Sequence, residues 1–224
     1  MRTLGVWSGA LSVILAAGAV GVQHWDFEDA AAGKLPSGWK AATTGEGAGS
    51  VWSVETDAAA PAGPKVLAQT SSEGPRPLFN LCIAEETSYR DLDLRVAMKA
   101  VRGKIDQGGG PVWRLRDKDN YYIARMNPLE NNYRVYKVVD GKRTQLASAD
   151  VEAKDDAGKP APLTGAWHTI RIVQRGDRIR CYLHGKLLLE ASDATFREAG
   201  KVGLWTKADA VTSFDGLSVK DLTQ

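Results

Sequence analysis

The sequence predicts an all-β protein, a jelly-roll sandwich of two antiparallel sheets. Short segments in which apolar and polar residues alternate recur along the chain, and turns rich in Gly, Asp and Asn separate them. No long segment repeats its apolar residues with the period of a helix. Regularly spaced short strands joined by such turns are typical of sandwiches. A chain of 224 residues suits one large domain of this kind.

The individual strands follow from the alternation. It predicts strands at residues 92–98, 112–116, 121–125, 133–139, 168–174, 178–183 and 187–190. The turn at 117–120 makes a hairpin of its two flanking strands, and Asp140-Gly141 is a strong tight-turn signal. We expect the first strand, near residues 25–27, to pair with the last, near 214–219. Residues 57–65 and 153–165 are rich in Ala, Pro, Gly and charge, which predicts surface loops.

The N-terminus has the pattern of a signal peptide. Arg2 precedes an apolar run from Leu11 to Val22, and Ala17-Gly18-Ala19 offers a cleavage site. We therefore expect a signal peptide at residues 1–22, a β-sandwich domain at 23–224, and a secreted or periplasmic protein of the cell envelope. An uncleaved N-terminal anchor is the alternative. No membrane span is expected in the mature protein.

The overall charge gives no reason to expect nucleic acid as a partner. The chain has 29 basic and 27 acidic residues, for a net charge of +2, and lacks a dense Lys/Arg block. The sequence does not specify an oligomeric state.

Two cysteines raise the question of a disulfide. Export would permit one. However, Cys82 alternates with the apolar residues Phe79, Leu81 and Ile83, whereas Cys181 shares a face with the apolar residues of its own strand. We expect two separate thiols on this basis, with a disulfide as the alternative.

Familiar catalytic signatures are absent from the sequence. It contains no G-x-S-x-G, H-E-x-x-H, C-x-x-C or phosphate-binding glycine motif. The paired carboxylates of a retaining glucanase are also missing, since the nearest match, at Glu55-Thr56-Asp57, lacks the second Glu. His168 shares a face with Ile170, which favours a hydrogen-bonded wall residue over a catalytic base.

A set of polar and aromatic residues lies at the parity opposite the predicted core. Trp205 and Lys207 share one face of their strand, and Arg125 and Asn127 share another. We hypothesise a sugar-binding surface on one concave sheet, with an aromatic platform ringed by polar groups. Its predicted members are Trp205, Lys207, Arg114, Arg125, Asn127 and Glu130. The alternative is that Trp205 fills the core and the arginines pair with acids on a solvated face.

Two acidic turns are weak candidates for calcium. They are residues 106–110, which begin with Asp106, and residues 117–120. Ordinary turn chemistry accounts for the same residue types. We therefore expect no cofactor, with calcium as the alternative.

The sequence resembles a known superfamily. The resemblance runs from about residue 25 to 222 and is carried by WDFEDAAAGKLPSGW, GGGPVWRLRDKDNYYIARMNPLENNYRVYKVVDGKRTQL, GAWHTIRI, CYLHGK and GKVGLWTKADAVTSFDGLSV. These stretches are similar to the secreted bacterial branch of the concanavalin A-like lectin/glucanase superfamily related to the 3-keto-disaccharide hydrolase domain, often described as family 16 glycosidase-like. The resemblance implies the concanavalin A-like sandwich and a carbohydrate or glycoside partner.

The sequence keeps only part of the residue pattern of this family. Arg114 corresponds to an arginine that such hydrolases carry. Arg125 and Asn127 stand where the family has Glu and Gln, and residues 203–207 replace a Gly-Leu-Gln-x-His segment. Both departures remove groups suited to acid–base catalysis, leaving Glu130 and His168 as weak catalytic candidates. We expect an exported carbohydrate-recognising domain. The alternatives are a 3-keto-glycoside hydrolase or lyase, and a structural or interaction module of the cell envelope.

Overall fold

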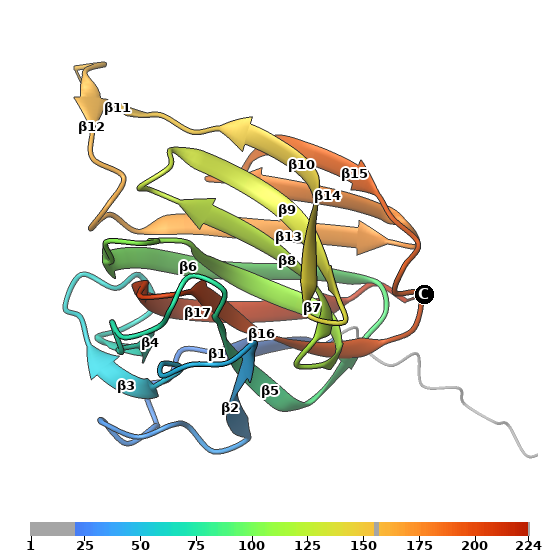
Figure 1. Cartoon of the computed structure of the whole chain (residues 1–224), viewed down its shortest axis with the longest axis horizontal. Helices are drawn as coiled ribbons and strands as arrows, with labels where there is room; N and C mark the ends of the chain where they lie inside the picture. The colour runs from blue at the N-terminus through green and yellow to red at the C-terminus, as the bar shows by residue number, and fades with distance from the viewer. Residues whose placement is uncertain (1–20, 155–156, 224) are drawn as a thin grey trace, which may run out of the picture.

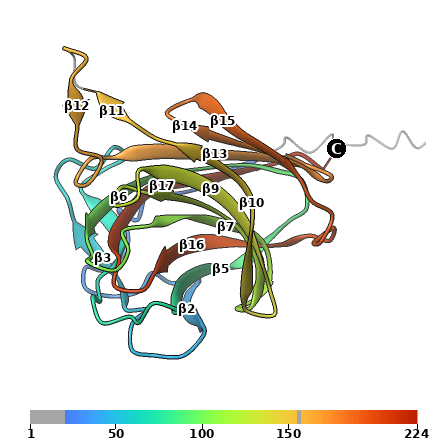
Figure 2. The same cartoon turned by 45° about the horizontal axis from the view of Figure 1, so that its top comes forward.

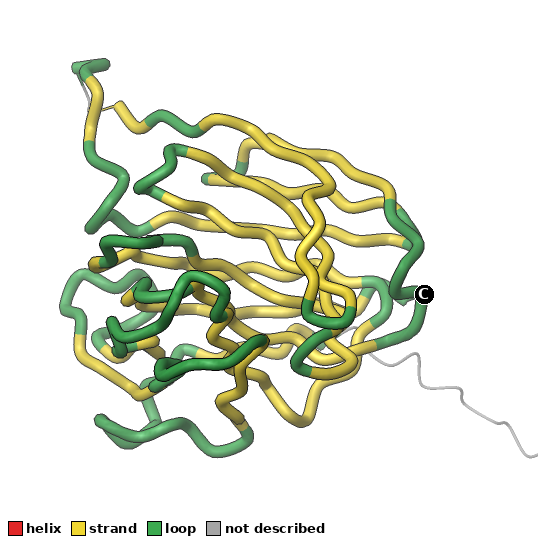
Figure 3. Tube along the Cα trace, in the orientation of Figure 1, coloured by secondary structure: helices red, strands yellow, loops and turns green. Residues whose placement is uncertain are grey.

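A computed structural model describes residues 21–154 and 157–223, which fold into two large antiparallel sheets (Figure 1). Strands dominate the trace, with loops mainly between them (Figure 3). The strands are β1 (Val22–Trp25), β2 (Trp39–Thr44), β3 (Trp52–Thr56), β4 (Lys65–Gln69), β5 (Phe79–Tyr89), β6 (Leu92–Arg102), β7 (Gly109–Asp117), β8 (Asn120–Asn127), β9 (Asn132–Val139), β10 (Lys142–Asp150), β11 (Ala153–Lys154), β12 (Pro160–Ala161), β13 (His168–Arg175), β14 (Arg178–Leu183), β15 (Lys186–Ser192), β16 (Gly200–Lys207) and β17 (Val211–Asp221).

The two sheets confirm the predicted all-β sandwich. One has the order β15-β14-β13-β6-β17-β4-β3, with β1 also paired to β17, and the other has the order β10-β9-β8-β7-β16-β5-β2. The expected pairing of the ends is present, since Trp25 lies opposite Leu217. Residues 153–165 are not wholly loop, because β11 and β12 form a small two-stranded sheet there. The predicted signal segment lies outside the described residues, apart from residues 21 and 22.

The main core lies between the sheets. Alternate residues of β6, from Leu92 to Met98, are fully buried there, together with Trp113 and Leu204 from the opposite sheet. Burying each large apolar side chain contributes about 1.5–3 kcal/mol to folding. In the described ranges there is no helix long and apolar enough to cross a membrane.

The seven-stranded sheet also buries its second face. Figure 2 shows that this sheet curls, and its inner face holds a separate apolar cluster. The cluster consists of Phe79, Leu81, Ile83, Val112, Leu115, Tyr121, Ile123, Tyr136, Val138 and Trp205. We call this inner face the concave face. Strands buried on both faces have lost the simple apolar–polar alternation.

Hydrogen bonds between β2 and the β7–β8 hairpin show how strongly the seven-stranded sheet is curved. The Thr44 hydroxyl on β2 lies 2.8 Å from the Tyr121 hydroxyl on β8 and donates to the Lys118 carbonyl. In the sheet, β7, β16 and β5 stand between β8 and β2. The edge strand has therefore come round to meet the β7–β8 turn.

The cysteines are separate, as predicted, but for a different reason. Cys82 and Cys181 are both free and both belong to the core between the sheets. Parity was misleading for Cys82 because the apolar residues Phe79, Leu81 and Ile83 face the second cluster, so both faces of β5 are apolar.

We expect thiol reagents to find both cysteines only after unfolding. Burial raises the pKa of both thiols, which suppresses the reactive thiolate. Thiol titration of non-reduced protein should give two free groups in denaturant and almost none in the native state. A monomer without titratable thiols in denaturant would show that a disulfide had formed.

Candidate functional site

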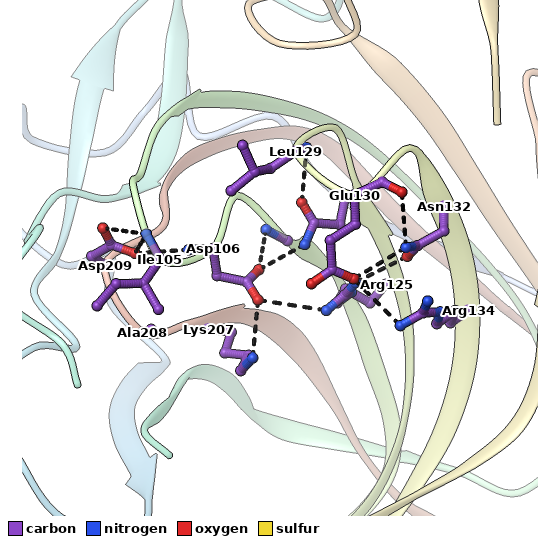
Figure 4. Close-up of polar contacts among 12 residues, drawn as sticks. Ile105, Asp106, Arg125, Leu129, Glu130, Asn132, Arg134, Lys207, Ala208 and Asp209 are labelled. Atoms are coloured by element: carbon purple, nitrogen blue, oxygen red, sulfur yellow. Dashed lines mark hydrogen bonds and ion pairs between the residues drawn. The ribbon is translucent and has the colours of Figure 1, made fainter. Parts of the chain in front are cut away.

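A buried carboxylate organises the polar end of the concave face. Asp106, in the loop before β7, accepts hydrogen bonds from Lys207 Nζ at 3.1 Å, Asn127 Nδ2 at 3.1 Å and the Gly108 amide at 2.6 Å. Arg125 Nη1 lies 3.6 Å away as a further ion-pair partner (Figure 4). A carboxylate shielded from water requires such compensation, so these side chains are fixed around it.

The loop that carries Asp106 is itself held by a second carboxylate. Asp209 accepts hydrogen bonds from the amides of Lys104, Ile105 and Asp106, at distances from 2.6 to 3.1 Å. The glycine at position 108 is required by close approach, because a Cβ there would lie 2.7 Å from both Arg125 Cδ and Asp106 Oδ1. The Gly-rich segment after Asp106 is thus explained by packing.

Glu130 extends the network outward from Arg125. Its Oε2 accepts hydrogen bonds from Arg125 Nη2 at 2.6 Å, Asn132 Nδ2 at 3.1 Å and Arg134 Nη1 at 3.3 Å. Burial would raise the pKa of Glu130, but the hydrogen bonds from Asn132 and Arg125 outweigh it and lower the pKa to about 2. Glu130 is therefore ionised at neutral pH, which suits a hydrogen-bond acceptor and makes a weak general base.

The network ends against the aromatic cluster. The Tyr136 ring has the Arg143 guanidinium carbon 4.4 Å from its centroid and that of Arg125 at 6.0 Å. Among the described residues, Arg125 Nε, Arg143 Nη1 and the Tyr136 hydroxyl are buried without a hydrogen-bond partner. The neighbouring Tyr136 side chain is the main cause of the raised pKa of Arg134. The Tyr136 hydroxyl nevertheless has no partner in hydrogen-bonding geometry. Buried polar atoms are nearly always satisfied, so this grouping suggests an incomplete site.

Trp205 does not provide the exposed platform that the parity pattern predicted. It does share the concave face, but the side chain is 0% exposed. Its ring lies 5.2 Å from that of Phe79, and its Nε1 donates to the Tyr121 hydroxyl at 3.3 Å. The curl of the sheet covers the ring, so Trp205 is part of the second apolar cluster.

Arg114 also lies elsewhere. It adopts a positive φ of 45° in an irregular part of β7 and is almost fully buried. Its guanidinium donates to the carbonyls of Arg90, Phe196 and Gly176 and to Asp91. It ties loops together and takes no part in the Asp106 network. Asn127 belongs to that network but is wholly buried, so it supports Asp106 without reaching the surface.

His168 is on the other sheet and is a wall residue, which was the interpretation favoured over a base. Its Nε2 donates to the Leu163 carbonyl at 2.8 Å, and its Nδ1 lies 3.0 Å from His184 Nε2. Burial lowers the pKa of His168. It lines a cleft of about 770 Å³ that shares residues 150–154 and Leu163 with an adjoining cleft of about 450 Å³ lined by Glu130. The partners of His168 are Leu163 and His184, and those of Glu130 are Arg125, Asn132 and Arg134, so the two catalytic candidates do not form a hydrogen-bonded pair.

Several members of the network escaped the sequence analysis. Asp106 was considered only as a calcium-binding turn, and its carboxylate instead pairs with Lys207 and Arg125. In the part of the chain that the structure describes, no group of three or more His, Cys, Asp or Glu side chains could hold a metal ion. The other missed residues are Asn132, Arg134, Tyr136 and Arg143. Predicting which strands pair would have pointed to some of these residues, because Arg134 on β9 lies opposite Arg125 on β8.

A family model and several solved structures match this chain, and they have the same fold. Residues 26–220 match the family model described as the 3-keto-alpha-glucoside-1,2-lyase-like domain. The structure is similar to carbohydrate-binding module CBM66 from Bacillus subtilis, with a TM-score of 0.62 and 18% identity over 82% of this chain and 96% of that one. It is also similar to a Bacillus licheniformis beta-glucanase, with a TM-score of 0.57 and 12% identity over 90% and 98% of the two chains.

A third similar structure is the cellulose induced protein Cip1. Its TM-score is 0.57 and its identity 13%, over 88% of this chain and 96% of that one. No curated protein matches the sequence. The fold is thus the concanavalin A-like sandwich that the sequence resembled.

Replacing Trp205 tests its role in the core. We expect Trp205→Ala to lower the free energy of unfolding by about 3–5 kcal/mol, because it leaves a large cavity. Leu187→Ala, at an exposed apolar residue on β15, is the control and should change it by less than about 0.5 kcal/mol. Urea unfolding curves measure both. A Trp205→Ala variant as stable as the wild type would mean that the ring is not packed.

The Glu130 network makes a specific contribution to acid sensitivity. Its pKa in the folded chain, about 2, lies below the ordinary value of 4.5, so its stabilising effect is present above pH 4.5 and is lost as the pH falls toward 2. Because the side chain is 39% exposed, solvent screening keeps this effect small. We expect Glu130→Gln to flatten the fall in stability between those pH values, measured by urea unfolding. Glu190→Gln, in an exposed pair, is the control, and equal slopes in both variants would contradict the assignment.

Proposed function

The chain belongs to the family of 3-keto-alpha-glucoside-1,2-lyase-like domains, and on that premise we propose that it binds a carbohydrate at the polar end of its concave face. The observation that carries the proposal is the network around Asp106 and Arg125. Three of its members reach solvent: Lys207 is 15% exposed, Arg134 32% and Glu130 39%. We call these three the rim residues.

The rim residues are held in place before any ligand arrives. Lys207 is fixed by Asp106, and Glu130 is fixed by Arg125 and Asn132. Groups already ordered lose little conformational freedom on binding. Two cations and one carboxylate can donate to and accept from the hydroxyl groups of one sugar ring. Because Trp205 is buried, this recognition relies on polar contacts and not on an exposed stacking ring.

The similar structures support the proposal at the level of architecture. One is named as a carbohydrate-binding module and another as a beta-glucanase. We also propose export of the protein, on the apolar run and the small-residue site within residues 1–22.

Family membership favours one further candidate function, the 1,2-elimination of a 3-keto-glycoside. The ketone at C3 acidifies the hydrogen at C2. A base takes that proton, the C2–H electron pair forms the new double bond, and the group on C1 leaves with its bonding pair and is protonated. Lys207 and Arg134, the two cations that reach solvent, would stabilise the negative oxygen that develops at C3. The low pKa of Glu130 makes it a weak base for removing the proton from C2.

The proposal can be tested by replacing one rim cation. We expect Lys207→Met to weaken glycan binding about 10- to 100-fold, the effect of losing a charged hydrogen bond. Lys220→Met, on the exposed end of β17, is the matched control and should bind like the wild type. A glycan panel finds the ligand and titration calorimetry measures affinity, with thermal melts confirming the fold.

The outcomes separate the two functions. Equal affinity of both lysine variants, or no binding to any carbohydrate in the panel, would overturn the binding proposal. Turnover of a 3-keto-glycoside by the wild type that Glu130→Gln abolishes, with binding retained, would establish the elimination instead.

A further inference from the structure

Arg143 has no acidic partner among the described residues. It lies on the edge strand β10, and its guanidinium carbon is 4.4 Å from the ring centroid of Tyr136, 5.2 Å from that of Phe79 and 5.8 Å from that of Trp205. The structure assigns it no salt bridge in the described ranges, and its Nη1 is buried without a hydrogen-bond partner. Desolvation lowers the pKa of this guanidinium, but a guanidinium still keeps its charge. Arg143 is thus a half-buried positive charge that Asp106 and Glu130 influence from a distance but that forms no salt bridge with a described side chain.

The carboxylates near Arg143 are bonded to other groups. Asp106 is paired with Arg125 and Lys207, and Glu130 is paired with Arg125 and Arg134. The other carboxylates nearby are engaged as well: Asp209 accepts hydrogen bonds from the 104–106 amides, and Asp150 acts on Arg134. None of them forms a salt bridge with Arg143 among the described residues. An anion from outside the chain is the group that would pair with Arg143.

The unsatisfied atoms lie around one ring. Arg125 and Arg143 both contact Tyr136, and each has a buried nitrogen without a partner, as does the Tyr136 hydroxyl. An arginine fork presents paired donors whose spacing matches the two oxygens of a carboxylate. The contact with Tyr136, 4.4 Å from the guanidinium carbon to the ring centroid, restrains the Arg143 side chain before a ligand binds. Arg143 as a whole is partly exposed, which leaves it within reach of a ligand on the concave face.

We propose that the carbohydrate bound here is acidic, of the uronic acid class, and that Arg143 pairs with its carboxylate. This inference rests on the proposed function and narrows its ligand class. The neutral part of the sugar would lie against the rim residues, and the carboxylate would lie toward Tyr136.

The test compares acidic and neutral sugars of the same size. Calorimetry with oligogalacturonides and with the same oligosaccharides reduced at the carboxyl carbon should show at least about tenfold tighter binding of the acidic form. That ratio should fall toward one in Arg143→Met and recover in part in Arg143→Lys, which restores the charge without the fork. Arg180→Met, in an exposed pair on β14, should keep the wild-type ratio. Raising the salt concentration should reduce the ratio in the wild type.

Each outcome has one meaning. Equal binding of acidic and neutral sugars, or an unchanged ratio in Arg143→Met, overturns this inference and leaves the proposed function standing. Absence of binding to either sugar counts against the proposed function itself. Tighter binding of sulfated than of carboxylated oligosaccharides would replace the uronic acid class. If Arg143→Met does not fold, a ratio in Arg143→Lys equal to that of the wild type overturns the inference.

Discussion

The curl of the seven-stranded sheet is the constraint on which the site depends. Where strands lie close, glycine is needed: a Cβ at Gly110 would be 1.9 Å from the Ala124 carbonyl oxygen, and one at Gly203 would be 2.4 Å from the Cys82 oxygen. Register shifts occur in the pairings of β16 with β5, of β7 with β8 and of β9 with β10, and such bulges increase twist. The resulting curvature brings β2 round to the β7–β8 turn. One end of the concave face is then filled by side chains, and the polar network occupies the other.

The two ends of the concave face obey different physical rules. At the Tyr121 end, aromatic and aliphatic side chains exclude water and stabilise the curl by burial. At the Asp106 end, burial of a carboxylate demands cations and amide donors. Arg143 stands between the two, with its guanidinium over the rings and close enough to Asp106, Glu130 and Arg125 to be influenced by their charges. That position makes it the one cation of the polar end whose partner the described chain does not supply.

Sequence alone could predict the architecture because β6 and β13 keep one polar and one apolar face, which fixes their orientation. Alternation could not predict the burial of side chains on β5, β7, β8 and β16, because both faces of these strands are apolar and buried. Trp205 and Lys207 do share a face, as alternation required, but the exposure of each depends on curvature. Asp106 and Lys207 are 101 positions apart, and only the pairing of the strands shows that they meet. The sequence of a Gly-rich acidic turn such as residues 106–110 does not distinguish a turn that binds a metal ion from one that pairs with an arginine.

The arrangement of charges bears on what kind of atom the site can receive. Two carboxylates at the polar end orient cations, since Asp106 holds Lys207 and Arg125, and Glu130 holds Arg125 and Arg134. Asp209 beside them accepts hydrogen bonds from backbone amides. A base needs a pKa near the working pH, and the donors around Glu130 move its pKa far below that. The oriented cations remain as the groups with capacity for a ligand. Such a site is suited to electron-rich oxygen atoms, whether of a sugar hydroxyl, a carboxylate or an enolate. Binding and oxyanion stabilisation therefore follow from the same geometry, and proton abstraction would need a group that this network does not provide.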